Sequence, residues 1–125
     1  MKRLISLFLF LALVIPAGNA KGDEFYKIIY NMGYTDVSVK ELEKEEIVLP
    51  ERFGAVYERY NEIQKAGGYD LTAYRGKSCT RYTYEIPSKN ARANILVYEG
   101  KIIGGDISSI TIDGIMIPIK KEYED

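Results

Sequence analysis

Apolar residues recur every three or four positions in two parts of this chain, and this spacing predicts helices. Phe25, Ile28, Ile29 and Met32 share one helical face, and Gly33 follows where such a helix would end. A longer segment begins at Pro50, a residue that favours the first turn of a helix. Its apolar and aromatic positions keep the same spacing up to the pair Gly67-Gly68: Phe53, Val56, Tyr57, Tyr60 and Ile63.

From Lys77 onward the apolar period changes to two, which is typical of strands with one buried face. Thr80, Tyr82, Tyr84 and Ile86 fall on one side of the first strand. Turn sequences follow at Pro87-Ser88-Lys89-Asn90, Glu99-Gly100 and Asp113-Gly114, and the last two are two-residue hairpin signals. The pattern therefore predicts an antiparallel meander with strands at about residues 77–86, 91–98, 101–112 and 115–119.

The segment between the two helices is harder to interpret from its pattern. Val37 and Val39 alternate with polar residues and suggest an edge strand. The run Lys40-Glu41-Leu42-Glu43-Lys44-Glu45-Glu46 is read as a charged, solvated excursion, although a docking patch for a basic partner is an alternative. Ile47-Val48-Leu49 then suggests a short second piece of strand.

These elements predict a single α+β domain over residues 21–119, with two helices packed on one face of a roughly four-stranded antiparallel meander. The other face of the sheet is expected to be open to water. Gly104-Gly105 inside the third strand suggests a bulge or a close backbone approach, and residues 120–125 are expected to fray. The expected core consists of Phe53, Val56, Tyr60, Tyr82, Tyr84, Ile95, Val97, Ile110 and Ile112.

The first 20 residues have the three parts of a secretory signal peptide. Lys2 and Arg3 precede an apolar run from Leu4 to Ile15, which is shorter than the roughly 20 residues that a spanning helix needs. Gly18 and Ala20 are small enough for the signal peptidase, so cleavage after Ala20 and export are expected. An uncleaved segment that anchors the protein in the membrane is the alternative.

Charge and cysteine content narrow the possible partners. Removal of residues 1–20 takes away two of the 17 basic residues and none of the 18 acidic ones, so the net charge changes from −1 to −3. This balance argues against nucleic-acid binding. Lys21 follows the cleavage site where a lipoprotein would have cysteine, and the single cysteine, Cys79, rules out an intramolecular disulfide.

The composition also excludes several kinds of catalysis. The chain has no histidine, so histidine acid–base chemistry and the usual hydrolase triads are absent, as are ordinary zinc sites. Cys79 has no base near it in sequence, and a plain strand residue is the favoured interpretation over a nucleophile. We therefore expect no catalytic residues, no metal site and no cofactor.

The polar side of the predicted sheet is the remaining candidate site. Arg81, Glu85, Arg92 and Asn94 are expected to project from it, with Asp106 close to the predicted bulge. A merely solvated face is the alternative. A surface of arginine, asparagine and acids suits a peptide, a glycan or another envelope protein as partner.

Several segments together resemble one protein family. They are residues 49–53, 57–65, 68–77, 81–85, 92–98 and 100–107, of which the last reads Gly-Lys-Ile-Ile-Gly-Gly-Asp-Ile. Over about residues 49–114 the chain resembles domain of unknown function 4830, a family of small exported or membrane-tethered proteins of clostridia-like Gram-positive bacteria. The resemblance implies export but no particular activity. Some members have cysteine where this chain has Ser108, and the family's aromatic residue and His-Gly pair after the last hairpin are replaced here by residues 115–119.

Three functional hypotheses follow from the sequence. The first is a non-catalytic binding or regulatory module outside the cytoplasm. The second is a minimal enzyme or enzyme inhibitor acting on cell-wall or peptide substrates, for which a deep pocket containing Arg92 and Asp106 would be the supporting observation. The third is a structural protein of the envelope or spore.

Overall fold

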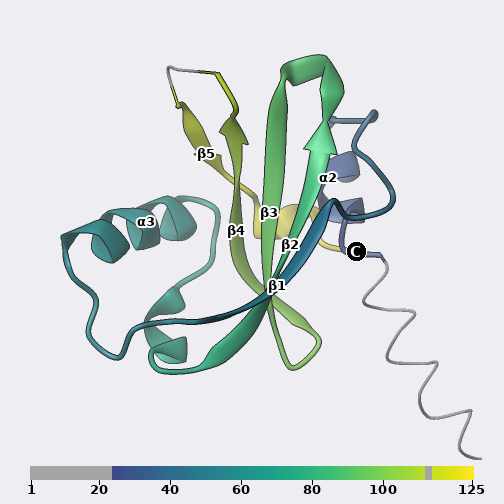
Figure 1. Ribbon diagram of the computed structural model, residues 1–125. Coiled ribbons are helices and arrows are strands. Elements are labelled where there is room, and N and C mark those ends of the chain that lie inside the picture. Colours follow the sequence, from purple (N-terminus) through teal and green to yellow (C-terminus); the bar gives the residue numbers. More distant parts are fainter. Residues whose placement is uncertain (1–23, 112–113) are drawn as a thin grey trace, which may run out of the picture.

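The computed structural model of this protein describes residues 24–111 and 114–125, and in this part of the chain helices flank a five-stranded antiparallel sheet (Figure 1). The strands follow one another in the order β1-β2-β3-β4-β5, so the sheet is a meander, as the hairpin signals predict. The strands are β1 (Glu43–Val48), β2 (Ser78–Ile86), β3 (Ala91–Tyr98), β4 (Lys101–Ser109) and β5 (Met116–Pro118). The α-helices are α2 (Lys27–Asn31) and α3 (Ala55–Ala66), and the 3₁₀ turns are η1 (Leu71–Tyr74), η2 (Pro87–Lys89) and η3 (Lys121–Tyr123).

Ile47 and Val48 lie in a strand as the sequence suggests, but this edge strand, β1, also includes Glu43 to Glu46 of the charged run that the sequence assigns to a solvated excursion. The sheet therefore has five strands where about four were expected. Glu43 to Glu46 pair with Thr83 to Thr80 of β2. Val37 and Val39, which the sequence suggests as a strand, lie outside any strand. An edge strand tolerates charge because its side chains reach water, and charged side chains on an edge discourage pairing with another chain.

The two helices lie on opposite faces of the sheet, so the prediction that both pack on one face is wrong (Figure 1). Alternate residues of β2 show this directly. Tyr82 and Tyr84 pack with α2 residues such as Ile28, whereas Cys79 belongs to a second cluster next to Tyr57 and other aromatic residues of the α3 region. A helical pattern shows that one side of a helix is buried, but it does not say which side of the sheet buries it.

The two clusters also divide the predicted core. Tyr82, Tyr84, Ile95 and Val97 are buried on the α2 side, while Phe53 and Tyr60 pack on the α3 side. Two of the expected core residues are exposed instead, Val56 by 69% and Ile110 by 53%. Ile112 lies outside the described residues. Both faces therefore bury apolar side chains, and neither is left wholly open.

The predicted irregularity at Gly104-Gly105 is confirmed as a shift of register between β3 and β4. Val97 pairs with Ile102 but Leu96 pairs with Gly104, so β4 contains one extra residue, Ile103. Such a bulge normally leaves a backbone group without a ladder partner. The close approach is also present, because a Cβ on Gly105 would lie 2.2 Å from the backbone oxygen of Asn94.

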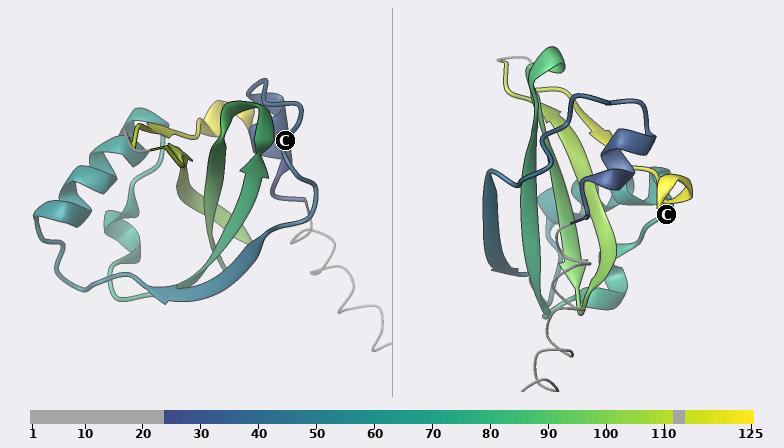
Figure 2. Two further views of the ribbon diagram at one scale, coloured as in Figure 1. Left: turned by 45° about the horizontal axis from the view of Figure 1, so that its top comes forward. Right: turned by 90° about the vertical axis from the view of Figure 1, so that its right-hand side faces the viewer.

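The C-terminal residues, for which the sequence suggests fraying, lie against α2 (Figure 2). Asn31 at the end of α2 donates to the backbone oxygen of Tyr123 at 3.0 Å and to the Asp125 carboxylate at 3.0 Å. The Tyr69 hydroxyl donates to the carboxylate of Glu124. Within the described residues, no helix is both long and apolar enough to cross a membrane.

Candidate functional site

A pocket of about 290 Å³ lies between α3 and the sheet face that it covers. Val56, Tyr57 and Tyr60 of α3 line one side. The opposite side is contributed by every strand of the sheet or the residue next to it: Ile47, Leu49, Arg81, Asn94, Leu96, Asp106 and Met116. The volume is just below the roughly 300–1,000 Å³ that ligand pockets occupy, so only a small group fits.

Asp106 is the polar centre of this pocket, and its residue is only 2% exposed. The Tyr60 hydroxyl donates to Asp106 Oδ1 at 2.7 Å. Asn94 Nδ2 and Ser108 Oγ donate to Asp106 Oδ2 at 3.2 and 2.5 Å. Asn94 is oriented in turn by Thr83, whose hydroxyl donates to Asn94 Oδ1 at 2.8 Å. A buried carboxylate needs such donors, since burial without them is costly.

Tyr60 is a donor and not an acid at any ordinary pH. Burial first, and then the Asp106 carboxylate beside it, raise the pKa of the Tyr60 hydroxyl far above its usual value. The hydroxyl therefore stays protonated and holds its hydrogen bond to Asp106. This pair is suited to orienting a ligand, because a hydroxyl that keeps its proton does not act as a general acid or as a nucleophile.

The guanidinium group of Arg81 has one nitrogen in an ion pair and another with no hydrogen-bond partner in the part of the chain that the structure describes. Its terminal nitrogen forms an ion pair of 2.5 Å with Glu45 Oε1 on β1, and the two side chains are 37% and 54% exposed. Its Nε atom, by contrast, is out of contact with solvent and has no hydrogen-bond partner among the described residues. An unsatisfied buried N–H is uncommon in folded proteins and indicates a place where an acceptor would be favourable.

The buried side chain of Gln64, 1% exposed, fixes α3 above the pocket. Gln64 Oε1 accepts a 2.7 Å hydrogen bond from the backbone N–H of Gly105 at the bulge of β4. Its Nε2 atom donates to the backbone oxygen of Tyr60 at 3.3 Å. The buried amide of Gly105 is thus satisfied by α3, two residues after the extra residue Ile103, and helix and strand are held at a fixed separation.

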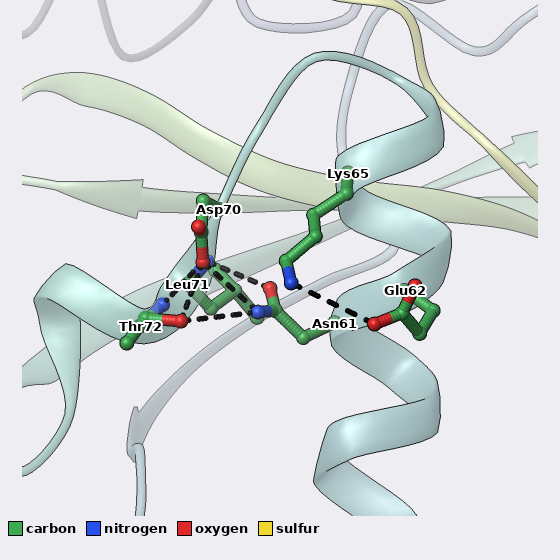
Figure 3. Close-up of polar contacts among 6 residues, drawn as sticks. All are labelled: Asn61, Glu62, Lys65, Asp70, Leu71 and Thr72. Carbon is green, nitrogen blue, oxygen red and sulfur yellow. Dashed lines mark hydrogen bonds and ion pairs between the residues drawn. The ribbon is translucent and has the colours of Figure 1, made fainter.

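A second buried amide, Asn61, ties α3 to the following turn η1 (Figure 3). Asn61 Oδ1 accepts from the backbone N–H of Leu71 at 2.7 Å, and Asn61 Nδ2 donates to Asp70 Oδ1 at 2.9 Å. Asp70 caps η1, as the sequence predicts, by accepting from the N–H of Thr72 at 2.9 Å. These hydrogen bonds, from Asn61 first, lower the pKa of the Asp70 carboxyl to about 2.

The structure brings together three of the five residues that the sequence nominates. Arg81, Asn94 and Asp106 line one pocket, whereas Glu85 and Arg92 are exposed on the same side of the sheet, nearer the β2–β3 turn. The sequence predicts that this face of the sheet is open to water. In the structure, α3 covers the end of the face that contains the pocket.

Sequence reasoning found Asn94 but missed the other two donors to Asp106, Tyr60 and Ser108. It assigned Tyr60 to a uniform core and gave no role to Ser108. One signal in the sequence could have indicated that a helix covers this face. Leu96 is apolar but lies on the side of β3 interpreted as polar, and a buried apolar residue there needs another element to cover it.

Cys79 is buried and lies outside the residues that line the pocket. Burial first, and then the nearby Glu46, raise the pKa of its thiol. The thiol therefore stays protonated at neutral pH, which is the opposite of what a nucleophile requires. Within the described residues no cluster of three side chains suits a metal ion.

The fold and the site define a class: a small α+β protein in which a helix, held over an antiparallel sheet, forms a pocket around a buried aspartate. The chain belongs to the family described as Domain of unknown function (DUF4830), which matches residues 28–107. The match runs from α2 into β4, so it starts and stops earlier than the predicted stretch of about residues 49–114. It includes every polar residue that lines the pocket. Comparison with curated proteins and with solved structures gave no match.

Proposed function

We propose that this protein is a non-catalytic binding module that acts outside the cytoplasm, and that its binding site is the pocket between α3 and the sheet. The observation that carries the proposal is one pocket lined by a buried, hydrogen-bonded carboxylate, by an arginine with one unsatisfied N–H, and by mostly apolar or aromatic side chains. Ligand pockets typically combine apolar walls with a few fixed polar groups in this way.

The enzyme alternative has less support. It depends on a pocket that contains both Asp106 and Arg92, and Arg92 is exposed and does not line the pocket. The remaining polar groups, Tyr60 and Asn94, are engaged in orienting Asp106. Orientation without a nucleophile favours recognition over turnover.

The test blocks the pocket without disturbing the core. Val56 lines the pocket and is 69% exposed, so Val56→Trp should fill its mouth at little cost in stability. Val48 on β1 is 66% exposed and does not line the pocket, so Val48→Trp is the matched control. Small peptides and sugars are screened by the shifts that they cause in backbone amide NMR signals.

The proposal predicts at least one compound that shifts signals of the pocket strands and of α3. The effect should disappear in Val56→Trp and persist in Val48→Trp. A screen in which no compound perturbs these residues, or in which both variants bind equally, would overturn it.

A further inference from the structure

The hydrogen-bonding capacity left over in the pocket defines the chemistry of its ligand. We propose that the pocket recognises a neutral amide group attached to an aliphatic group, as in a leucine-type unit of a peptide. This inference rests on the proposed function, because it names the ligand class of the same site.

The first unused group is the Nε–H of Arg81, which can only donate. The charge of Arg81 is already paired with Glu45 at the far end of the guanidinium. The Nε–H group therefore needs a hydrogen-bond acceptor, but this acceptor need not carry a negative charge. Nε has no contact with solvent in the free protein. The proposal therefore requires neighbouring side chains to move when a ligand oxygen binds.

The second unused group is Asp106 Oδ1. A carboxylate has about four acceptor positions. Asp106 Oδ2 receives two donors, Asn94 and Ser108, but Oδ1 receives only the Tyr60 hydroxyl. One acceptor position on Oδ1 is therefore available to a donor of the ligand.

The charges around the pocket decide which group suits these positions. Arg81 contributes one positive charge, whereas Glu45 and Asp106 contribute two negative ones. Among the described residues, Asp106 forms no ion pair. A carboxylate ligand would place another negative charge beside Asp106, and an ammonium ligand would leave Arg81 Nε without an acceptor. A neutral amide supplies an acceptor oxygen and a donor nitrogen at once.

The apolar lining selects what the amide is attached to. Ile47, Leu49, Val56 and Leu96 are branched aliphatic residues, and the flexible side chain of Met116 lies at the same pocket. A volume of about 290 Å³ limits the attached group to a short aliphatic one. A peptide unit with such a side chain meets both requirements.

The experiment compares four probes with one aliphatic group and different heads: 4-methylpentanamide, 4-methylpentanoate, 4-methylpentylamine and 4-methylpentanol. Dissociation constants are measured at neutral pH from amide NMR shifts of the wild-type protein. We expect 4-methylpentanamide to bind at least about tenfold more tightly than each of the other three.

Two variants locate the effect. Arg81→Lys keeps the positive charge but removes the Nε–H, so it should abolish the preference for the amide over the alcohol. Asp106→Asn should reduce the preference over the carboxylate, because it removes the opposing charge. Melting temperatures of both variants establish that they are folded.

Equal binding of all four probes, or tightest binding of the acid or the amine, would overturn the amide inference while the binding module stands. The same holds if none of the four binds but another compound occupies the pocket. A pocket that binds nothing at all would overturn the proposed function as well.

Discussion

Three hydrogen bonds hold Asp106, and they come from three different elements, α3, β3 and β4. Its side chain is therefore both the polar centre of the pocket and a link between the helix and the sheet. A residue with this double role should affect stability even when no ligand is present.

We expect Asp106→Ala to lower the free energy of unfolding by about 3 kcal/mol, because Tyr60 and Asn94 lose their partner inside the protein. Arg92→Ala is the control, because Arg92 lies on the same side of the sheet as Asp106 but is exposed. It should change the free energy of unfolding by no more than about 0.5 kcal/mol. Urea unfolding of both variants measures the difference. Equal costs would mean that the hydrogen bonds to Asp106 contribute no stability.

Asp70 gives a prediction about pH. Its pKa in the folded protein, about 2, lies below the ordinary value of 3.8. A lowered pKa in the folded state stabilises the protein at pH values above the ordinary one, and this stabilisation is lost as the pH falls from about 4 toward 2. We expect a carbon-13 NMR titration of the Asp70 carboxyl to show a midpoint near 2.

Thr72→Val should move that midpoint upward, because it removes the hydroxyl that donates to Asp70 at 2.6 Å. The backbone N–H of Thr72 and the amide of Asn61 still donate, so the midpoint should stay below 3.8. Thr35→Val, at an exposed position in another part of the chain, should leave it unchanged. An unaltered midpoint in Thr72→Val would contradict the assignment of the cause.

At the residue scale, the sequence could predict part of the site. Arg81, Asn94 and Asp106 could be nominated because a period of two places polar side chains on one side of the strands. Tyr60 could not, because aromatic residues at helical spacing are most often core. Glu85 and Arg92 follow the same alternation as Asn94, and only the position of α3 separates them from the pocket.

At the scale of elements, the side chain of Gln64 in α3 accepts a backbone hydrogen bond from β4. Gln64→Ala should leave the N–H of Gly105 without its acceptor and lower the free energy of unfolding by about 2 kcal/mol. Hydrogen exchange of the Gly105 amide should become faster in this variant than in the wild type. Lys65→Ala, at the exposed neighbouring position, should change neither quantity.

This prediction also concerns the pocket, because Gln64 sets the distance of α3 from the sheet. A variant in which Gly105 stays as protected as in the wild type would contradict the role of Gln64. In that case the helix would be held by its aromatic contacts and by the hydrogen bonds of Tyr60 and Asn61.

Strands β2 to β5 could be predicted because alternation and hairpin turns are local signals. Strand β1 could not, since Glu43 to Glu46 are charged on both sides and match a solvated segment equally well. The placement of the helices on opposite faces could not be read from their own patterns either. It follows from the strands, where Leu96 and Cys79 supply an apolar cluster for α3 on the face that otherwise carries polar residues.

At the scale of the whole molecule, the proposal of export gives a prediction. Expressed in a Gram-positive host, the full chain should be found outside the cytoplasm with Lys21 as its first residue, because Gly18 and Ala20 fit the signal peptidase. Mass spectrometry of the protein in the medium measures this. Ala20→Leu should block cleavage and retain the protein at the membrane.

Intact wild-type chains that begin with Met1 and stay at the membrane would favour an anchor instead of a cleaved signal. The pocket would then still face outward, but its partner would have to come to the cell surface.

The bulge in β4 and the amide of Gln64 together have a consequence for how this protein can evolve. Without the extra residue of β4, the residues on one side of it would shift by one position and the N–H of Gly105 would point away from Gln64. Gln64 would then be a buried amide with no donor to accept from. Without the glutamine, the buried N–H of Gly105 would have no acceptor. Each change is harmful alone and less harmful when the other is present, so the two sites are epistatic. The length of one hairpin and the identity of a residue 41 positions before it should therefore change together among homologues.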